Sequence, residues 1–139
     1  MKIEPFLVAS TVIGILAQRL VRGVCPDCKK AYTLTLDHIY YDIVRQNLPD
    51  TPPDKLVFYK GEGCRRCNGK GHAKRLAIHE VLLVNQDLRA LISKNVPSGE
   101  IKELAVKNGM RTLFQDGLLK ALDGKTSLEE IVRAAYVSE

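Results

Sequence analysis

Cys25-Pro26-Asp27-Cys28 and Cys64-Arg65-Arg66-Cys67 contain all four cysteines of this chain. Each C-x-x-C segment, called a knuckle below, can place two thiolates on one side of a tight turn, and two knuckles can complete a tetrahedral four-sulfur shell around Zn²⁺. Glycines that reach positive φ without steric cost flank both segments, at Gly23, Gly61, Gly63, Gly69 and Gly71. The spacing predicts a structural zinc site, coupled to folding, with Cys25, Cys28, Cys64 and Cys67 as ligands.

The same cysteines allow other arrangements. Disulfide bonds would need an oxidising compartment, and buried thiols can also stay unpaired. A C-x-x-C segment can be a redox pair, although one pair is enough for that chemistry. His72 lies close to Cys67 and can replace a cysteine as metal ligand. The number and spacing of the cysteines favour a four-cysteine zinc site over these alternatives.

The composition is that of a globular protein. Hydrophobic residues make up 45% and charged residues 27% of 139 residues, which is typical of one domain or two small ones. The net charge of +5 permits an acidic partner but is too small to imply nucleic acid or a membrane surface. The apolar run at 6–17 is too short for a transmembrane helix. It is a poor signal peptide, because Glu4 and Pro5 lie where a basic region is needed.

Periodicity predicts a mainly helical α+β fold with an N-terminal helix over 5–22. That helix is apolar almost all round and should be buried, which hints at a piece of a larger protein. A second helix is expected over 36–48. Strands at 56–59 and 76–84 are expected to pair as a β-hairpin with the second knuckle at its turn. Four short helices follow Asn85 and form a small C-terminal bundle. The expected divisions are 1–22, 23–84 and 85–139.

Local patterns mark the ends of the later helices. Asn85 or Asp87 can cap the first of them, and Pro97-Ser98 opens the next. The segments 112–115 and 127–130 fit capping boxes at the starts of the last two. Gly124-Lys125-Thr126 is similar to the end of a phosphate-binding loop, but Leu119 occupies the position of the required first glycine. Gly124 is therefore interpreted as a helix C-cap, and the sequence offers no catalytic or nucleotide-binding residues.

Several basic residues have two interpretations. Arg19 and Arg22 end the predicted first helix, where cations offset the negative helix end; alternatively one of them reaches a phosphate or an acidic partner at an interface. Arg65, Arg66, Lys70, His72, Lys74 and Arg75 form a basic patch that suits an acidic partner. A solvated surface is the favoured interpretation of this patch. His38 and His79 lack any catalytic context in the sequence.

Taken together, these segments resemble the C-terminal region of the type II secretion and type IV pilus assembly ATPases (the GspE/PilB-like secretion ATPases). The resemblance covers nearly the whole chain. It rests on 4–10, 17–22, 25–29, 63–67, 78–82, 109–113, 116–118 with Lys120, and 124–133. The chain departs from the family pattern at Gly71-His72 and Lys74-Arg75. Relatives commonly have Gly-Tyr and Gly-Arg there, so the outer surface of the second knuckle is expected to differ in partner preference.

The resemblance implies a role for each division. Residues 1–22 would close a RecA-like ATPase core, 23–84 would form its tetracysteine zinc subdomain, and 85–139 its helical tail. Structural Zn²⁺ is the implied cofactor, whereas ATP and Mg²⁺ would bind only the parent protein. The Walker A, Walker B and histidine-box motifs are absent from this sequence, so the chain alone is expected not to hydrolyse ATP.

The resemblance also implies a setting. The parent would be a cytoplasmic hexamer, peripheral to the inner membrane, that powers assembly of a type II secretion pseudopilus or a type IV pilus. Its expected partners are neighbouring ATPase subunits and an inner-membrane platform protein, with no nucleic acid and no transmembrane segment. The alternative from another class is a free-standing zinc adaptor that binds nucleic acid or a protein, and a third is a secreted disulfide protein.

Overall fold

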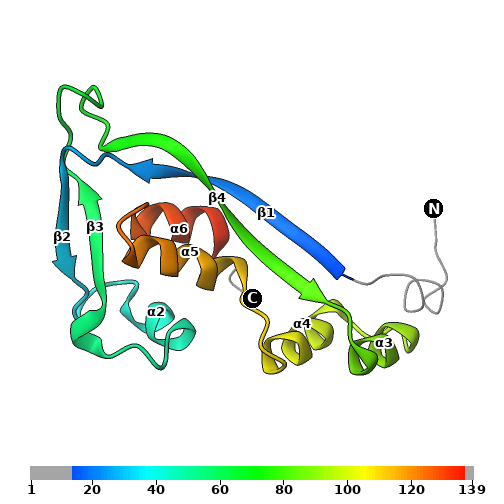
Figure 1. The fold of residues 1–139 in the computed structure, drawn as a ribbon. Helices are drawn as coiled ribbons and strands as arrows, with labels where there is room; N and C mark the ends of the chain where they lie inside the picture. Colours follow the sequence, from blue (N-terminus) through cyan, green and yellow to red (C-terminus); the bar gives the residue numbers. More distant parts are fainter. Residues whose placement is uncertain (1–13, 137–139) are drawn as a thin grey trace. The chain divides into compact units, whose positions relative to one another are not determined.

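The structure is a computed structural model, and it describes residues 14–136 of the chain. Residues 5–13 of the helix predicted over 5–22 therefore lie outside the described residues. The elements, in chain order, are β1 (Gly14–Val24), β2 (Lys29–Thr33), α2 (Tyr41–Asn47), the 3₁₀ turn η1 (Pro53–Lys55), β3 (Val57–Gly61), β4 (His72–Leu83), α3 (Gln86–Ser93), α4 (Ser98–Lys107), α5 (Leu113–Leu122) and α6 (Leu128–Ala135) (Figure 1). Helices and two small two-stranded sheets confirm the predicted α+β class.

The described residues separate into two compact units by their Cα packing. Of the described residues, the knuckle unit comprises 18–78 and 113–136, and it contains both cysteine pairs. The helical unit contains His79–Thr112 together with the start of β1. The chain passes from one unit to the other within β1, within β4 and again between Thr112 and Leu113. Among the described residues, no helix combines the length and the hydropathy that crossing a bilayer requires.

One hydrophobic core holds the knuckle unit together. β2 and β3 pair antiparallel, with Lys29 opposite Gly61 and Thr33 opposite Val57. Figure 1 shows α2 at one end of this pair and α5 lying against α6. Their buried side chains meet in a single cluster that includes Val21, Leu34, Val44, Leu56, Phe58, Ile78, Leu118, Leu128 and Ile131. A Cβ on Gly117 would lie 2.7 Å from Ile131 Cγ2, so only glycine permits this close packing of α5 on α6.

The turn between α5 and α6 is the one that the local sequence predicts. Gly124 has φ +79°, its N–H donates to the Ala121 oxygen at 3.0 Å, and Lys125 N–H donates to the Lys120 oxygen at 3.1 Å. These two bonds form a Schellman C-cap, which confirms the interpretation of Gly124. Ser127 then caps α6 by accepting a hydrogen bond from Glu130 N–H at 3.3 Å.

The predicted N-terminal helix is wrong where it is described, because residues 14–22 lie in strand β1. Tertiary pairing overrides the helical periodicity here. A Cβ on Gly23 would lie 2.7 Å from the Ala73 oxygen and one on Gly14 3.2 Å from the Leu82 oxygen, so β1 and β4 run antiparallel. Along β1, Val21 is buried whereas Leu20 is 60% exposed, which is the alternation of a strand.

The predicted hairpin also pairs the wrong strands. Both strands exist, but β3 pairs with β2, and β4 pairs with β1. The knuckle loop between β3 and β4 therefore connects two different sheets. The sequence pattern of a strand shows which of its residues alternate in burial, but not which other strand it pairs with. The wrong pairing was predicted because the partner strand is set by contacts between residues far apart in the sequence.

The second predicted helix is shorter than expected. It begins at Tyr41, and 36–40 form turns in which Leu36 and Ile39 are more than four-fifths exposed, at 82% and 83%. Local side-chain bonds compete with the helix there. The Thr35 hydroxyl donates to the Asp37 carboxylate, and His38 Nδ1 accepts from Tyr40 N–H at 3.1 Å.

The four C-terminal helices are all present, but they divide differently from the single bundle predicted. α3 packs on α4 in the helical unit, and α5 packs on α6 in the knuckle unit. Val84, Leu88 and Ala105 are buried in the small core of the helical unit. The division into 1–22, 23–84 and 85–139 stays a prediction about the organisation of a larger protein.

Helix α3 provides a test of its predicted cap. The Asn85 side chain accepts from Leu88 N–H at 2.9 Å. Asn85→Ala is expected to destabilise α3 by about 1 kcal/mol, because Leu88 N–H loses its partner. Amide hydrogen exchange of α3 measures the effect. Ser93→Ala at the exposed last residue of the helix is the control, and equal exchange in the two variants would refute the cap.

Candidate metal centre

The fold brings the two knuckles together. Cys25 follows β1 directly and Cys28 precedes β2, while Cys64 and Cys67 lie in the loop between β3 and β4. The four Sγ atoms all lie within 4.8 Å of one another. The separations are 3.8 Å for Cys25–Cys64, 3.8 Å for Cys28–Cys67 and 3.7 Å for Cys64–Cys67.

The sulfur–sulfur separations distinguish a disulfide from a metal-binding cluster. A disulfide places its sulfur atoms about 2.05 Å apart, and the four cysteines are free. In a tetrahedral shell with metal–sulfur bonds of about 2.3 Å, neighbouring sulfur atoms are about 3.8 Å apart. Three of the six sulfur–sulfur separations, those at 3.7–3.8 Å, match that edge length, and the others stay within 4.8 Å. The four side chains can therefore hold one metal ion with only small movements.

Backbone N–H groups donate hydrogen bonds to two of these sulfur atoms and so stabilise their thiolate forms. Cys67 Sγ accepts from Cys64 N–H and from Gly71 N–H, both at 3.2 Å, and Cys28 Sγ accepts from Gly63 N–H at 3.3 Å. Desolvation acts to raise the pKa of Cys67, but these N–H groups and the neighbouring thiols lower it to about 6. Desolvation, together with hydrogen bonds to the other three thiols, raises the pKa of Cys28 to about 12 although the Gly63 N–H acts to lower it. Thiolates are the species that metal ions bind.

Further contacts join the two knuckles to each other. Cys25 N–H donates to the Gly71 oxygen at 2.9 Å, and Glu62 N–H donates to the Cys28 oxygen at 3.2 Å. On the surface, Arg66 Nη1 lies 3.1 Å from Asp27 Oδ2. The backbone itself therefore holds the knuckles face to face, and a metal ion would tighten an existing arrangement.

Gly71 provides a test of that arrangement. It has φ +77°, and a Cβ there would lie 2.5 Å from the Gly61 oxygen. Gly71→Ala is expected to weaken metal binding about 10- to 100-fold, because it displaces the N–H that supports Cys67. Competition with a metal-binding dye measures the affinity.

Gly69→Ala is the matched control, because Gly69 has φ +75° but no atom within 4 Å of the place that a Cβ would take. Gly69→Ala should cost only about 1 kcal/mol of stability for its left-handed backbone and leave metal affinity within about threefold. Equal metal affinities in the two variants would show that the close approach to Gly61 is unimportant.

None of the three histidines belongs to the cysteine cluster in the described residues. His38 Nδ1 accepts from Tyr40 N–H, and its ring stacks on Tyr32. His79 lies in β4. His72 lies at the start of β4, and its Nδ1 is buried without a hydrogen-bond partner among the described residues. The structure thus offers His72 no metal-binding role in this cluster.

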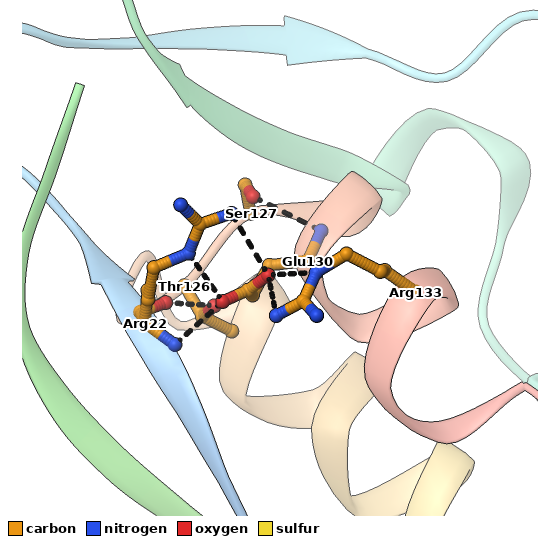
Figure 2. Close-up of polar contacts among 5 residues, drawn as sticks. All are labelled: Arg22, Thr126, Ser127, Glu130 and Arg133. Carbon is orange, nitrogen blue, oxygen red and sulfur yellow. Dashed lines mark hydrogen bonds and ion pairs between the residues drawn. The ribbon is translucent and has the colours of Figure 1, made fainter. Parts of the chain in front are cut away.

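A second polar centre, around Glu130, was missed by the sequence analysis. Glu130 in α6 is 2% exposed, and its carboxylate lies between Arg22 of β1 and Arg133 of α6 (Figure 2). Oε2 accepts from Arg22 N–H at 2.7 Å and Nε at 2.9 Å, and Oε1 lies 2.6 Å from Arg133 Nη2. Thr126 Oγ1 donates to the Arg22 oxygen at 2.7 Å.

These contacts explain both the charge of Glu130 and the place of Arg22. Desolvation acts to raise the Glu130 pKa, but the hydrogen bonds from Arg22 and Arg133 lower it to about 2. Arg22 was expected to offset a helix end or to reach an outside partner; it instead binds a carboxylate 108 residues further along the chain. The Ser127–Glu130 capping box placed Glu130 in a first helical turn, but nothing local identified Arg22 as its partner.

Comparison with known proteins covers nearly the whole chain. A family model described as "Type II/IV secretion system protein" matches residues 1–133. The chain is 42% identical over 132 residues to the type IV pilus assembly ATPase PilB of Thermus thermophilus, covering 95% of this chain and 14% of that protein. It is 39% identical over 138 residues to the type II secretion system ATPase E of Vibrio cholerae, covering 99% of this chain and 26% of that protein. The chain therefore spans about a quarter or less of the length of these relatives.

Proposed function

This chain belongs to the type II/IV secretion system protein family, and from that premise we propose that it is the zinc-binding C-terminal segment of a secretion ATPase. The parent would be a cytoplasmic hexamer, peripheral to the inner membrane, that powers assembly of a type II secretion pseudopilus or a type IV pilus. Its partners would be neighbouring subunits and an inner-membrane platform protein. The names of the relatives, a pilus assembly ATPase and a secretion system ATPase, support this proposal.

The observation that carries the zinc proposal is the four-sulfur cluster, whose sulfur atoms all lie within 4.8 Å of one another and in three pairs are 3.7–3.8 Å apart. A four-thiolate shell suits zinc or iron, and an isolated Cys₄ site of two knuckles is typical of structural zinc. Cys25, Cys28, Cys64 and Cys67 would fill every coordination position, so the ion would supply a cross-link and no hydrolytic chemistry. The cross-link would hold the start of β2 against the loop before β4.

ATP and Mg²⁺ would bind elsewhere in the parent protein. Gly124-Lys125-Thr126 follows helix α5 and closes a Schellman turn, so the N–H groups of Gly124 and Lys125 already have backbone partners. A phosphate-binding loop needs such groups free and placed after a strand. The segment would then contribute structure and contacts to the ATPase, and ATP chemistry would occur outside it.

Two measurements test this proposal. An intact Walker A motif encoded in frame upstream would support it, and a genuine start at Met1 would favour a free-standing zinc adaptor. In the full-length parent, Cys25→Ser with Cys28→Ser is expected to abolish pilus assembly or secretion while nucleotide binding is retained. Normal assembly by that variant would contradict a structural role for the cluster. Loss of nucleotide binding would show that the substitutions disrupt the ATPase core itself.

A further inference from the structure

A basic hollow lies beside the second knuckle, wholly within the knuckle unit. One part, of about 250 Å³, is lined by side chains that include Arg22, Lys60, Lys70, His72 and Arg133. An adjoining part, of about 520 Å³, is lined by Arg22, Lys70, His72, Ala73, Lys74 and Arg75. Arg22, Lys70 and His72 line both parts, so the two form one continuous surface. We call the set Arg22, Lys60, Lys70, His72, Lys74 and Arg75 the basic face.

Among the described residues of the knuckle unit, the positive charges of this face exceed the negative ones. Glu129 and Glu130 line the first part, but the Glu130 carboxylate is already bound by Arg22 and Arg133, so Glu129 alone offsets the lysines there. Within residues 14–136, no carboxylate lines the second part. Among the described residues, Lys60, Lys70, Lys74 and Arg75 form no ion pair, in contrast to Lys120, which pairs with Asp116 at 2.9 Å. The uncompensated charge at this face is therefore positive.

The face is also partly preorganised. Glu130 holds the Arg22 guanidinium through Nε at 2.9 Å and Nη2 at 3.3 Å, so Arg22 has a defined direction although its side chain is half exposed. The remaining nitrogen, Nη1, has no partner among the described residues. His72 adds a buried Nδ1 that also lacks one. The held Arg22 guanidinium loses little conformational entropy when a ligand binds, whereas each lysine of the face must be ordered by the ligand.

We propose that the basic face docks an acidic polypeptide segment, with one carboxylate seated in the hollow by Arg22 and Lys70. Three features favour a polypeptide. The cations extend from β3 through the knuckle loop to β4, which suits an extended chain carrying several carboxylates. Glu129 and Glu130 at the first part repel a doubly charged phosphate more strongly than a singly charged carboxylate. Among the described residues, Ala73 is the only apolar side chain that lines the second part, so a lipid would find little apolar contact there.

This inference goes beyond the proposed function, because it concerns a surface outside the cysteine cluster and requires no ATP hydrolysis. It is tested on the metal-loaded chain itself with a fluorescein-labelled octaglutamate peptide. Fluorescence anisotropy at low ionic strength measures the dissociation constant, and salt is expected to weaken binding. Absence of saturable binding by the unchanged chain would overturn the proposal, whatever the parent protein does.

The decisive comparison uses two variants of equal net charge. Lys70→Gln with Arg75→Gln is expected to weaken peptide binding about tenfold, since both side chains line the face. Lys102→Gln with Lys107→Gln on α4 should change it less than about twofold, because these exposed lysines line neither part of the hollow. If both variants weaken peptide binding equally, the peptide responds only to the net charge of the chain. That result would overturn the proposal of a specific binding face.

Competition separates the polypeptide from other anions. Unlabelled octaglutamate should displace the probe at a lower carboxylate concentration than inorganic phosphate, and vesicles of anionic phospholipid should not displace it at the same charge concentration. Stronger displacement by phosphate would make the hollow a phosphate site. Stronger displacement by vesicles would make the face a membrane contact. Either result would overturn the polypeptide assignment.

Discussion

Cys67→Ser is expected to release the metal from the purified chain and to lower its free energy of unfolding by several kcal/mol. Cys67 is 7% exposed and its sulfur accepts two backbone N–H bonds, so its thiolate is the best supported of the cluster. A serine hydroxyl stays protonated at neutral pH and does not replace a thiolate ligand. Structural zinc contributes directly to folding free energy, which is why the expected loss is large.

Elemental analysis and thermal unfolding measure this effect. The unchanged chain should carry close to one zinc per molecule, without the visible absorbance of an iron–thiolate centre. A chelator should lower the midpoint of the unchanged chain towards that of Cys67→Ser and have little effect on the variant. Metal well below one equivalent in folded, unchanged protein would contradict the zinc site.

Asp27→Asn is the matched control for the knuckles. It removes the surface pair with Arg66 but no thiol, and its cost should be at most about 1 kcal/mol with full metal content. A loss as large as that of Cys67→Ser would mean that any disturbance of the knuckles has the same effect, and the metal would no longer be needed to explain it.

Glu130→Gln is expected to cost about 2–3 kcal/mol. The substitution keeps the shape of the side chain, but an amide cannot accept the bonds that Arg22 and Arg133 donate to both oxygens. Hydrogen bonds to buried charges are each worth about 1.5–3 kcal/mol, and the two arginines are half exposed and regain water. Glu129→Gln makes the same charge change at an exposed neighbour and should stay within about 0.5 kcal/mol.

The pH dependence of this centre has a definite sign. The Glu130 pKa falls from 4.5 to about 2 in the folded chain. Its contribution is therefore fully present above about pH 5 and is lost as the pH falls through about 2. Chemical unfolding from pH 7 to pH 2 should show the difference between the unchanged chain and Glu130→Gln shrinking over this range. A constant difference would contradict the ionised, buried state of Glu130.

Local features were predictable from sequence because their causes lie within a few residues. Asn85 and Ser127 cap helices by bonding N–H groups three residues away, and Gly124 takes the left-handed backbone that ends α5. The C-x-x-C spacing likewise defines each knuckle. The predicted association of both cysteine pairs agrees with the cluster, while its metal stays a proposal.

Non-local choices were not predictable from these patterns. Residues 14–22 carry a helical periodicity, but the pairing of β1 with β4 makes them a strand. The exchange of strand partners has the same origin, since β2 and β4 are both compatible with β3 as far as alternation is concerned. Lys70, His72, Lys74 and Arg75 were recognised as part of a basic patch beside the second knuckle, yet only the fold brings these four into one hollow with Arg22.

The amino-acid sequence by itself determined the cysteine turns, the helix caps and the family of this protein, because each depends on spacing along the chain. Tertiary structure decided that the two knuckles face each other, that β1 is a strand, and that Glu130 binds Arg22 across 108 residues. The physical reason is that the stability of a strand pair or an ion pair depends on which residues distant in the sequence the fold brings into contact. Two C-x-x-C turns specify a metal site only when the sheets on either side bring their four sulfur atoms within 4.8 Å.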